Sequence, residues 1–515
     1  MNRRDFIAGA ATLLGWGMCG RAFAALPGAF SQGRPNLVFG VISDIHIRLN
    51  RKKGRKDTFE REDLFRRTLE WFRDQGVDAV TISGDMADHG LLEELDAVGR
   101  IWFSVFPDDK APDGRRVERL FVYGNHDWEG FKYGDAGKKT FGDDFERHTI
   151  RADLAAAWKR AFREDYAPVW RKDVKGYTFI GAHWTADRCR GREEIGVPQA
   201  PEWFKENGHT IDPSKPFFYL QHPPPKNACH GPWLWGHDDG RLTEALSAFP
   251  NAVALTGHSH APIADERAIW QGAFTSIDAG ALRNVSFEYG DMDPVGREND
   301  KNRLSASAED PYRVMKAMSA SDGHQGMLAR VFDDRIVFER RDLEDMGTVG
   351  PDWVVPLPVK APPAFAFEPR AAASVAPEFP AGAALKVRLT TGRNRGGKNV
   401  KAEEQGVLEV TIPAANGAGS GRVFDYALEL SGADGAKETR YVIAEGCYRS
   451  PGSERANSPT VCLLAVRRLK VSGEVELRVV PRNCFGKAGG AIGLRCEINL
   501  PETGALPPGG ERGNK

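Results

Sequence analysis

The feature that most constrains the fold is an alternation of short apolar runs with amphipathic helical stretches across residues 36–342. Six runs have the length of a buried strand: 37–43, 79–83, 120–123, 177–182, 217–221 and 252–256. Between the first two, apolar residues recur at helical spacing from Leu64 to Phe72, and Gly76 ends the expected helix. A hairpin-like pair, 327–332 and 336–340, follows. This alternation predicts an α/β domain with helices on the faces of a sheet.

The pattern changes after this domain. Residues 356–384 are rich in Pro and Ala, which predicts a stiff, extended linker. Beyond it, apolar and polar residues alternate without helical periodicity, as in the run from Leu408 to Ile412, and predict a small antiparallel β-sandwich over 385–500. Residues 483–487 (NCFGK) resemble the end of a fibronectin type III-like module. The tail, 501–515, is expected to be disordered.

The first 24 residues predict a signal peptide. Residues 2–7 (NRRDFI) resemble a twin-arginine motif, and an apolar run leads to residues 22–24 (AFA), a small-x-small cleavage pattern. The run is shorter than the roughly 20 residues that a membrane-spanning helix needs. We therefore expect an exported protein, periplasmic or extracellular, without a transmembrane segment after cleavage. An ordinary secretory signal is the alternative, because Asn2 and Ala8 are not the most frequent residues beside the arginine pair.

Charge and cysteine content argue against several classes of partner and site. Lys and Arg number 70 and Asp and Glu 71, so no global field attracts a nucleic-acid polymer or an anionic lipid surface. Cleavage of the leader would remove Cys19 and leave an even number of cysteines, which permits disulfides in an oxidising compartment. None shows C-x-x-C spacing, which argues against a cysteine zinc site or a redox motif.

Five polar blocks follow the strand-like runs. They are Asp44-Ile45-His46, Gly84-Asp85-Met86-Ala87-Asp88, Gly124-Asn125-His126-Asp127, His222 before two prolines, and Gly257-His258-Ser259-His260. Each block alone is more often a polar loop than a metal site. Together they stand at the carboxyl ends of predicted strands, where open α/β sheets place their ligand crevices. So many polar groups would be costly to bury without a shared partner, and the pattern predicts a metal cluster.

The five blocks resemble those of the calcineurin-like metallophosphoesterases, and the resemblance covers residues 36–342. It implies an αββα sandwich over 34–345 and two metal ions, Mn, Fe or Zn. The first metal would be bound by Asp44, His46, Asp85 and His260. The second would be bound by Asp85, Asn125, His222 and His258, so that Asp85 bridges. Asp88 stands where purple acid phosphatases carry a tyrosine, which argues against that subgroup.

The resemblance also implies a reaction, in which a metal-bridging hydroxide attacks phosphorus in line with the leaving group. His126 would be the general acid. Asp127 would orient His126 by accepting its second ring proton, or would instead cap the following turn. The expected partner is a small phosphorylated substrate. A phosphodiester is favoured over a phosphomonoester or nucleotide, because His126 matches the acid that the family uses for poorer leaving groups.

An alternative of another class is a catalytically inactive envelope binding protein that works through its β-sandwich. Inactive members would be expected to lose metal ligands or the acid histidine, and this chain keeps all of them. The β-sandwich itself could bind a glycan, a protein or the catalytic domain, or serve as a spacer.

Other residues near the blocks have weaker signals. A basic run follows the first block: Arg48, Arg51, Lys52, Lys53, Arg55 and Lys56. It is either a solvated insertion or an attractant for an anionic substrate. The segment after His222 carries His230, Trp233, Trp235 and His237, which either stack a ring of the substrate or pack the loop. His183 follows a predicted strand and could line the crevice, whereas His89 and His148 have no motif context, and Asp88 is expected to support its loop.

Overall fold

The structure, a computed structural model, describes residues 33–51, 56–129, 141–185, 196–230, 238–286, 322–392, 404–417, 421–466 and 469–499. The predicted leader and tail lie outside these residues. From Arg34 onward the chain forms one compact unit. Within the described ranges, no helix combines the length and the apolar character that crossing a membrane requires.

Two six-stranded sheets precede the Pro/Ala-rich segment. The first has the order β14 (Trp353–Pro356), β13 (Arg335–Asp342), β12 (Gln325–Val331), β1 (Leu37–Ile42), β4 (Ala79–Ser83), β5 (Glu118–Val122). The second has the order β10 (Ile269–Gln271), β11 (Thr275–Asp278), β9 (Ala252–Thr256), β8 (Phe217–Leu220), β7 (Tyr177–Ala182), β6 (Val169–Val174). β1, β4 and β5 run parallel, as do β7, β8, β9 and β11, so each group ends at one edge of its sheet.

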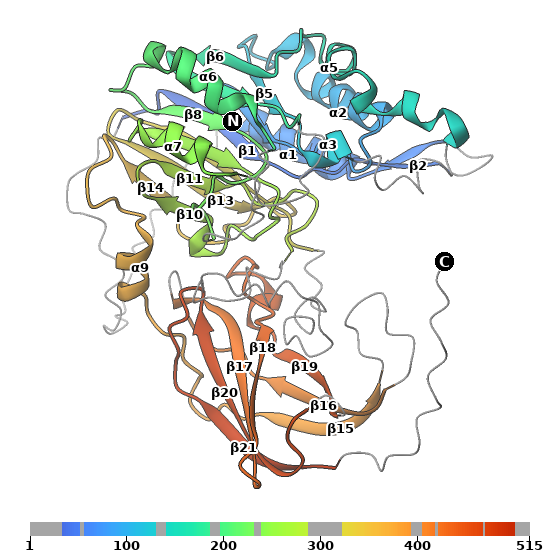
Figure 1. Ribbon diagram of the computed structural model, residues 1–515, viewed down its shortest axis with the longest axis vertical. Coiled ribbons are helices and arrows are strands. Elements are labelled where there is room, and N and C mark those ends of the chain that lie inside the picture. The colour runs from blue at the N-terminus through green and yellow to red at the C-terminus, as the bar shows by residue number, and fades with distance from the viewer. Residues whose placement is uncertain are drawn as a thin grey trace, which may run out of the picture. The chain divides into compact units, whose positions relative to one another are not determined.

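The two sheets pack face to face, and helices cover their outer faces (Figure 1). Between the sheets, the ring of Phe39 on β1 packs edge-on against Phe179 of β7 and Phe218 of β8. The first sheet shares a core with α1 (Glu62–Asp74), α2 (Leu92–Val105) and α5 (Leu154–Phe162). The second sheet shares a core with α6 (Gln199–Asn207) and α7 (Arg241–Ser247). The predicted αββα sandwich is confirmed.

The expected helix after the first strand is α1. It buries Leu64, Phe65, Thr68, Leu69 and Phe72, which recur every three or four residues and form one face. Gly76, with φ of 74°, follows the helix and allows the left-handed turn back into β4. Burial of this apolar face against the sheet therefore explains the length of α1, and the turn at Gly76 explains its end.

The C-terminal part of the described chain is all-β. A three-stranded sheet contains β15 (Lys386–Gly392), β16 (Glu404–Ile412) and β19 (Thr460–Ala465). A four-stranded sheet contains β18 (Lys437–Ile443), β17 (Val423–Gly432), β20 (Gly473–Asn483) and β21 (Ile492–Ile498). All strand pairs are antiparallel, and alternate residues of both sheets, such as Val410 and Leu428, are buried in one core. The predicted β-sandwich is confirmed, and its likeness to a fibronectin type III module stays a prediction.

The Pro/Ala-rich segment is not extended throughout. It contains a short helix, α9 (Phe367–Ala373), whose Arg370 lies 2.8 Å from a carboxylate oxygen of Glu266. This ion pair ties the segment to the α/β part of the chain, which a freely exposed linker would not require. The described cysteines, Cys229, Cys447, Cys462, Cys484 and Cys496, are free thiols.

Candidate metal centre

The seven predicted ligand residues meet at one edge of the two sheets. They are Asp44 and His46 after β1, Asp85 after β4, Asn125 at the start of α3 (Asn125–Glu129) after β5, His222 after β8, and His258 and His260 after β9. The sequence predicts that these loops converge, and the face-to-face packing adds that they come from two different sheets. Residues as far apart in sequence as His46 and His260 are thereby brought into contact.

One cluster contains the residues expected to bind the first metal: Asp44, His46, Asp85 and His260, with ligand atoms within 4.8 Å of one another. Nε2 of His260 lies 3.1 Å from Nε2 of His46 and 3.1 Å from Oδ1 of Asp44. Oδ1 of Asp44 is buried and makes no hydrogen bond. We call these four residues the first cluster.

The second cluster contains Asp85, His222 and His258, whose ligand atoms also lie within 4.8 Å of one another, together with Asn125. Nε2 of His222 lies 3.0 Å from Oδ1 of Asn125 and 3.1 Å from Nδ1 of His258. These are the residues that the resemblance assigns to the second metal.

Asp85 lies between the two clusters. Its Oδ2 is 3.5 Å from Nε2 of His46 in the first cluster and 3.2 Å from Nε2 of His222 in the second. Its Oδ1 accepts a hydrogen bond from the backbone N–H of His126 at 2.8 Å, which fixes the carboxylate. One oxygen of Asp85 therefore faces ligand atoms of both clusters.

The spacing of the donors fits bound metal ions. Two ligand atoms that each lie about 2.1 Å from one ion, at tetrahedral or octahedral angles, are about 3.0–3.4 Å apart. The 3.1 Å between the facing nitrogens of His46 and His260, and the 3.0 Å between His222 and Asn125, fall in this range. A mixed set of imidazole, carboxylate and amide donors suits Mn, Fe or Zn.

Backbone strain is concentrated at the same residues. Five of the seven have φ values in the left-handed region: Asp44 (52°), His46 (50°), Asp85 (52°), His258 (72°) and His260 (55°). Each such non-glycine residue costs of order 1 kcal/mol or more, and strain of this kind gathers at functional sites. These turns reverse the chain directly after the strands and direct the side chains toward the shared edge.

The outward-facing ring nitrogens of three histidines are also held. Nδ1 of His222 bonds to the carbonyl of Ser83 at 2.7 Å, and Nδ1 of His260 to the carbonyl of Asn284 at 3.1 Å. Such partners fix the tautomer and orientation of ligand imidazoles.

Nδ1 of His46 lies 3.1 Å from Oδ1 of Asp88. Asp88 is expected to support its loop, and its carboxylate also orients a predicted metal ligand. Arg283, which carries no sequence motif, donates to the same oxygen from Nη1 at 2.9 Å. Sequence reasoning missed Arg283 and Asn284, since both act through contacts between distant loops.

The charges of the two clusters depend on one another. Burial opposes ionisation of Asp44, but His260 and His222 hold the pKa of its carboxyl well below the ordinary value. Burial also lowers the pKa of the histidines, but the carboxylates outweigh it and raise the pKa of His46 and of His222 to about 9. Without metal, these two imidazoles are therefore cations paired with carboxylates at neutral pH.

His126 stands beside the first cluster, with its ring centroid 4.5 Å from that of His46. Its Nδ1 lies 2.8 Å from the backbone carbonyl of Asp88. Burial lowers the pKa of His126 to about 4, so the free imidazole is neutral at pH 7 and donates from Nδ1 to this carbonyl.

The expectation that Asp127 orients His126 is wrong. The carboxylate of Asp127 accepts hydrogen bonds from the backbone N–H groups of Ala87 and Gly124, both at 2.8 Å, and of Met86 at 3.2 Å. Three preorganised backbone donors satisfy this buried carboxylate, and the carbonyl of Asp88 takes the place beside His126. Nor does Asp127 cap the following turn. It joins the loops after β4 and β5.

Arg48 lies beside Asp88, and its role as a substrate contact stays a prediction. It begins β2 (Arg48–Asn50), which pairs with β3 (Thr58–Glu60), and its Nε is 3.7 Å from Oδ2 of Asp88 with 41% of the side chain exposed. Arg51 instead pairs with Asp57 at 2.8 Å and belongs to the hairpin. The predicted residues Lys52, Lys53, Arg55, Trp233, Trp235 and His237 lie outside the described residues.

The other histidines have structural roles. His183 is buried, accepts a hydrogen bond at Nδ1 from the backbone N–H of Tyr123, and has its pKa lowered to about 3 by burial. His230 is buried, and its pKa falls to about 4 for the same reason. His89 and His148 each pair with a glutamate of α2.

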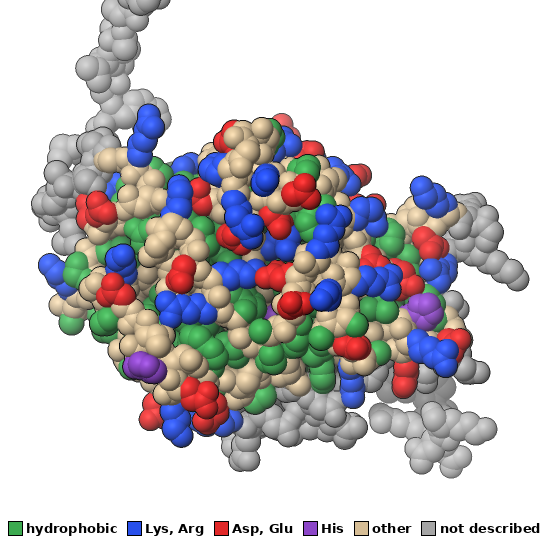
Figure 2. Space-filling view, turned by 90° about the horizontal axis from the view of Figure 1, so that it is seen from above, with side chains coloured by type: hydrophobic (Ala, Val, Ile, Leu, Met, Phe, Trp, Pro, Cys, Tyr) green, Lys and Arg blue, Asp and Glu red, His purple; other side chains and the backbone are tan. Residues whose placement is uncertain are grey.

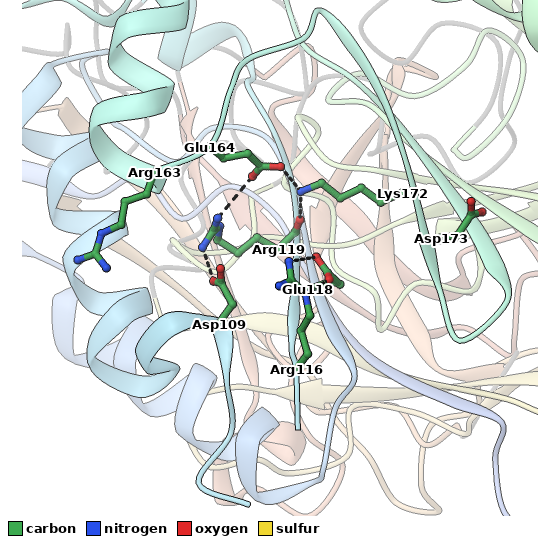
Figure 3. Close-up of a pocket in the computed structure, with 8 residues that line it drawn as sticks. All are labelled: Asp109, Arg116, Glu118, Arg119, Arg163, Glu164, Lys172 and Asp173. Atoms are coloured by element: carbon green, nitrogen blue, oxygen red, sulfur yellow. Dashed lines mark hydrogen bonds and ion pairs between the residues drawn. The ribbon is translucent and has the colours of Figure 1, made fainter. Parts of the chain in front are cut away.

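A separate cavity of about 440 Å³ lies at the amino end of β5, away from the clusters (Figure 3). It is lined by Asp109, Arg116, Glu118, Arg119, Arg163, Glu164, Lys172 and Asp173. Figure 3 shows that its acids and bases mostly pair with one another, as Arg119 does with Asp109 and Lys172 with Glu164. Charges that neutralise one another in this way offer little to an anionic substrate. Figure 2 likewise shows acidic and basic side chains interspersed over the face in view.

Comparisons place part of the chain among known proteins. Residues 37–262 match the model of the family described as calcineurin-like phosphoesterase. A search of curated proteins found no match. This matched range contains all seven residues of the two clusters.

Among solved structures, the chain is similar to a dimetal phosphatase from Danio rerio (13% identity, 62% of this chain and 98% of that chain, TM-score 0.34). It is also similar to a purple acid phosphatase from yellow lupin seeds, Lupinus luteus (13% identity, 62% and 54%, TM-score 0.37). A third is GAP50, the anchor in the inner membrane complex of Plasmodium (14% identity, 63% and 89%, TM-score 0.34). The similarity spans about half the length of the lupin protein.

Proposed function

We propose that the chain is a metal-dependent phosphoric ester hydrolase that hydrolyses a phosphodiester at a two-metal centre, because residues 37–262 match the calcineurin-like phosphoesterase model. The observation that carries the proposal is the position of Asp85 Oδ2 between His46 and His222, at 3.5 and 3.2 Å. A single carboxylate oxygen shared by two complete ligand sets supports two ions rather than one.

In the proposed centre, the first cluster holds one metal and the second cluster the other. When bound, two such ions bind a phosphoryl oxygen and lower the pKa of a water molecule held for in-line attack on phosphorus. The surrounding residues hold the seven ligand side chains in place around the two proposed metal positions. Ser83, Asn284 and Asp88 serve this task by holding the outer nitrogens of His222, His260 and His46.

His126 is the proposed general acid. The carbonyl of Asp88 keeps one hydrogen on Nδ1, so a second proton must reside on Nε2. The pKa of about 4 in the free protein leaves Nε2 unprotonated at pH 7. The negative charge of a bound phosphate ester favours the imidazolium form. His126 therefore takes up a proton with the substrate and delivers it from Nε2 to the leaving-group oxygen.

A diester is preferred here because His126 resembles the acid that the family uses for poorer leaving groups, to which it would supply a proton. Arg48, 41% exposed beside Asp88, is a proposed contact for an anionic part of the substrate. Hydrolysis of a phosphomonoester or nucleotide at the same centre is the second candidate. The retention of every ligand and of His126 argues against an inactive binding protein.

The proposal includes export to the periplasm or the extracellular space. It rests on the twin-arginine-like residues 2–7 and on the small-x-small pattern at residues 22–24. A twin-arginine route carries folded proteins, so the metal would be bound before export. The physiological substrate would then be a small phosphate ester of the cell envelope or the surroundings.

The experiment compares hydrolysis of bis-p-nitrophenyl phosphate with that of p-nitrophenyl phosphate by the mature chain, stripped of metal and reconstituted with Mn²⁺. We expect metal-dependent turnover of the diester, abolished in Asp85→Asn. His126→Ala should lower this turnover by less than the roughly 10²–10⁴-fold typical of general acid catalysis, because p-nitrophenolate leaves without a proton. Preference for the monoester would move the substrate class to the second candidate. Absence of turnover of either substrate, with two metals bound, would contradict the proposed activity.

A further inference from the structure

Residues 279–286 lie outside the predicted ligand blocks but contact the first cluster. The backbone N–H of Arg283 donates to the carbonyl of Asp44 at 2.8 Å. The carbonyl of Asn284 holds Nδ1 of His260 at 3.1 Å. We call these residues the support segment, because they contact two members of the first cluster through the backbone.

The support segment is also connected to His46, a third residue of the first cluster, through the side chains of Arg283 and Asp88. Nη1 of Arg283 donates to Oδ1 of Asp88 at 2.9 Å, and the same oxygen lies 3.1 Å from Nδ1 of His46. The orientation of both imidazoles in the first cluster therefore depends on this segment. In the second cluster, by contrast, His222 is held by Ser83 at the end of β4.

The support segment is itself packed into the β-sandwich. Val285, adjacent to Asn284, is fully buried and belongs to the same hydrophobic core as Tyr448. Its backbone N–H donates to the carbonyl of Gly323 at 2.7 Å. A Cβ on Gly323 would lie 2.7 Å from both Val285 and Tyr448, so the three residues are in close contact.

Polar contacts complete this connection. The hydroxyl of Tyr448, between β18 and β19, lies 2.8 Å from Oδ1 of Asp322, whose other oxygen is bound by Arg449. The side-chain amide of Gln325 donates to the carbonyl of Tyr448, and the backbone N–H of Gln325 donates to Ala281 of the support segment at 2.9 Å. Tyr448 thus has both apolar and polar routes to the segment.

We propose that the C-terminal β-sandwich positions the first metal cluster, with Tyr448 and Val285 setting the place of the Asn284 carbonyl that orients His260. Tyr448 and Val285 are positioning residues, since neither touches a ligand atom of the clusters. The inference rests on the proposed function, because it concerns the affinity of the same centre for metal. It gives the β-sandwich a task that a spacer would not have.

The test is titration of the metal-free full chain with Mn²⁺ by calorimetry, comparing Tyr448→Ala with Tyr426→Ala. Both tyrosines are buried in the β-sandwich core, but Tyr426 bonds to Ala415 and Pro413 rather than to the support segment. We expect Tyr448→Ala to weaken one of two Mn²⁺ sites about 10-fold or more, the usual effect of losing a partner behind a ligand. The other site, and both sites of Tyr426→Ala, should change less than twofold.

A second variant, Val285→Ala, removes less volume and decides the matter if Tyr448→Ala does not fold. It should weaken the same single site while circular dichroism stays that of the wild type. Equal weakening of both sites, or no weakening in folded Val285→Ala, would overturn the inference and leave the proposed function standing. Failure of the wild-type chain to bind Mn²⁺ would instead overturn the proposed function.

Discussion

At the scale of single residues, the metal centre depends on groups that do not themselves face the metal. Asp88 is 5% exposed and is surrounded by His46, His89, Arg48 and Arg283. Burial raises the pKa of its carboxyl, but the hydrogen bond and charge of His46, together with the charge of Arg283, outweigh burial and hold this pKa below the ordinary value. Asp88 therefore stays ionised and keeps Nδ1 of His46 protonated, which leaves Nε2 as the ligand atom.

Replacing Asp88 tests this role. We predict that Asp88→Ala lowers Mn²⁺ affinity about 10–100-fold, because His46 loses the partner that fixes its ring. Asp239→Ala is the matched control, since Asp239 pairs with Arg241 outside both clusters. Calorimetric titration of the two variants gives the comparison. Unchanged affinity in Asp88→Ala would show that His46 is held by its packing alone.

At the scale of elements, the strand-end loops approach so closely that only glycine fits at some positions. A Cβ on Gly257, after β9, would lie 1.8 Å from Oγ of Ser43 and 2.4 Å from Oδ2 of Asp44, after β1. These loops belong to opposite sheets, and their contact lets His258 donate from its backbone N–H to Asp44 at 2.9 Å. Gly257 therefore permits the two halves of the centre to meet.

We predict that Gly257→Ala lowers the free energy of unfolding by about 1–3 kcal/mol, the usual cost of overpacking. It should also weaken Mn²⁺ binding, because Asp44 must move. Gly452→Ala is the control, since nothing lies within 4 Å of a Cβ there. Urea denaturation with and without Mn²⁺ measures both effects. Equal stability of the two variants would mean that the loops can separate without loss.

Much of this element-level description is predictable from the sequence. Runs such as 79–83 are mostly apolar because both faces of their strand are buried, and the polar blocks after them mark the site. The division into two sheets follows from the family resemblance and not from the runs themselves, because strand pairing depends on contacts between distant segments. The roles of Asn284 and Arg283 are hidden for the same reason. Asp127 was misassigned because its three backbone partners follow from loop geometry, not from its place beside His126.

At the scale of the whole molecule, the two clusters link stability to pH and to metal. His46 and His222 have pKa values of about 9 in the metal-free fold, above the ordinary 6.5. A raised pKa stabilises the fold fully below pH 6.5, and this contribution is lost as pH rises toward 9. Metal binding requires the neutral imidazole, so it competes with these protons.

We therefore predict opposite pH trends for the two forms. Between pH 7 and 9 the melting temperature of the metal-free chain should fall, whereas Mn²⁺ affinity, and with it the added stability, should rise. Calorimetry in buffers of different ionisation enthalpy should detect proton release on Mn²⁺ binding at pH 7. His222→Gln should release fewer protons than the wild type. Binding without proton release would contradict the protonation states assigned to His46 and His222.

The central claim, two metals bridged by Asp85, is tested most directly by anomalous X-ray diffraction from crystals of the mature chain grown with Mn²⁺. The account predicts two anomalous peaks about 3.5–4 Å apart. One peak should lie within the first cluster and the other within the second, with Oδ2 of Asp85 between them. A single peak, or none at this edge of the sheets, would contradict the account.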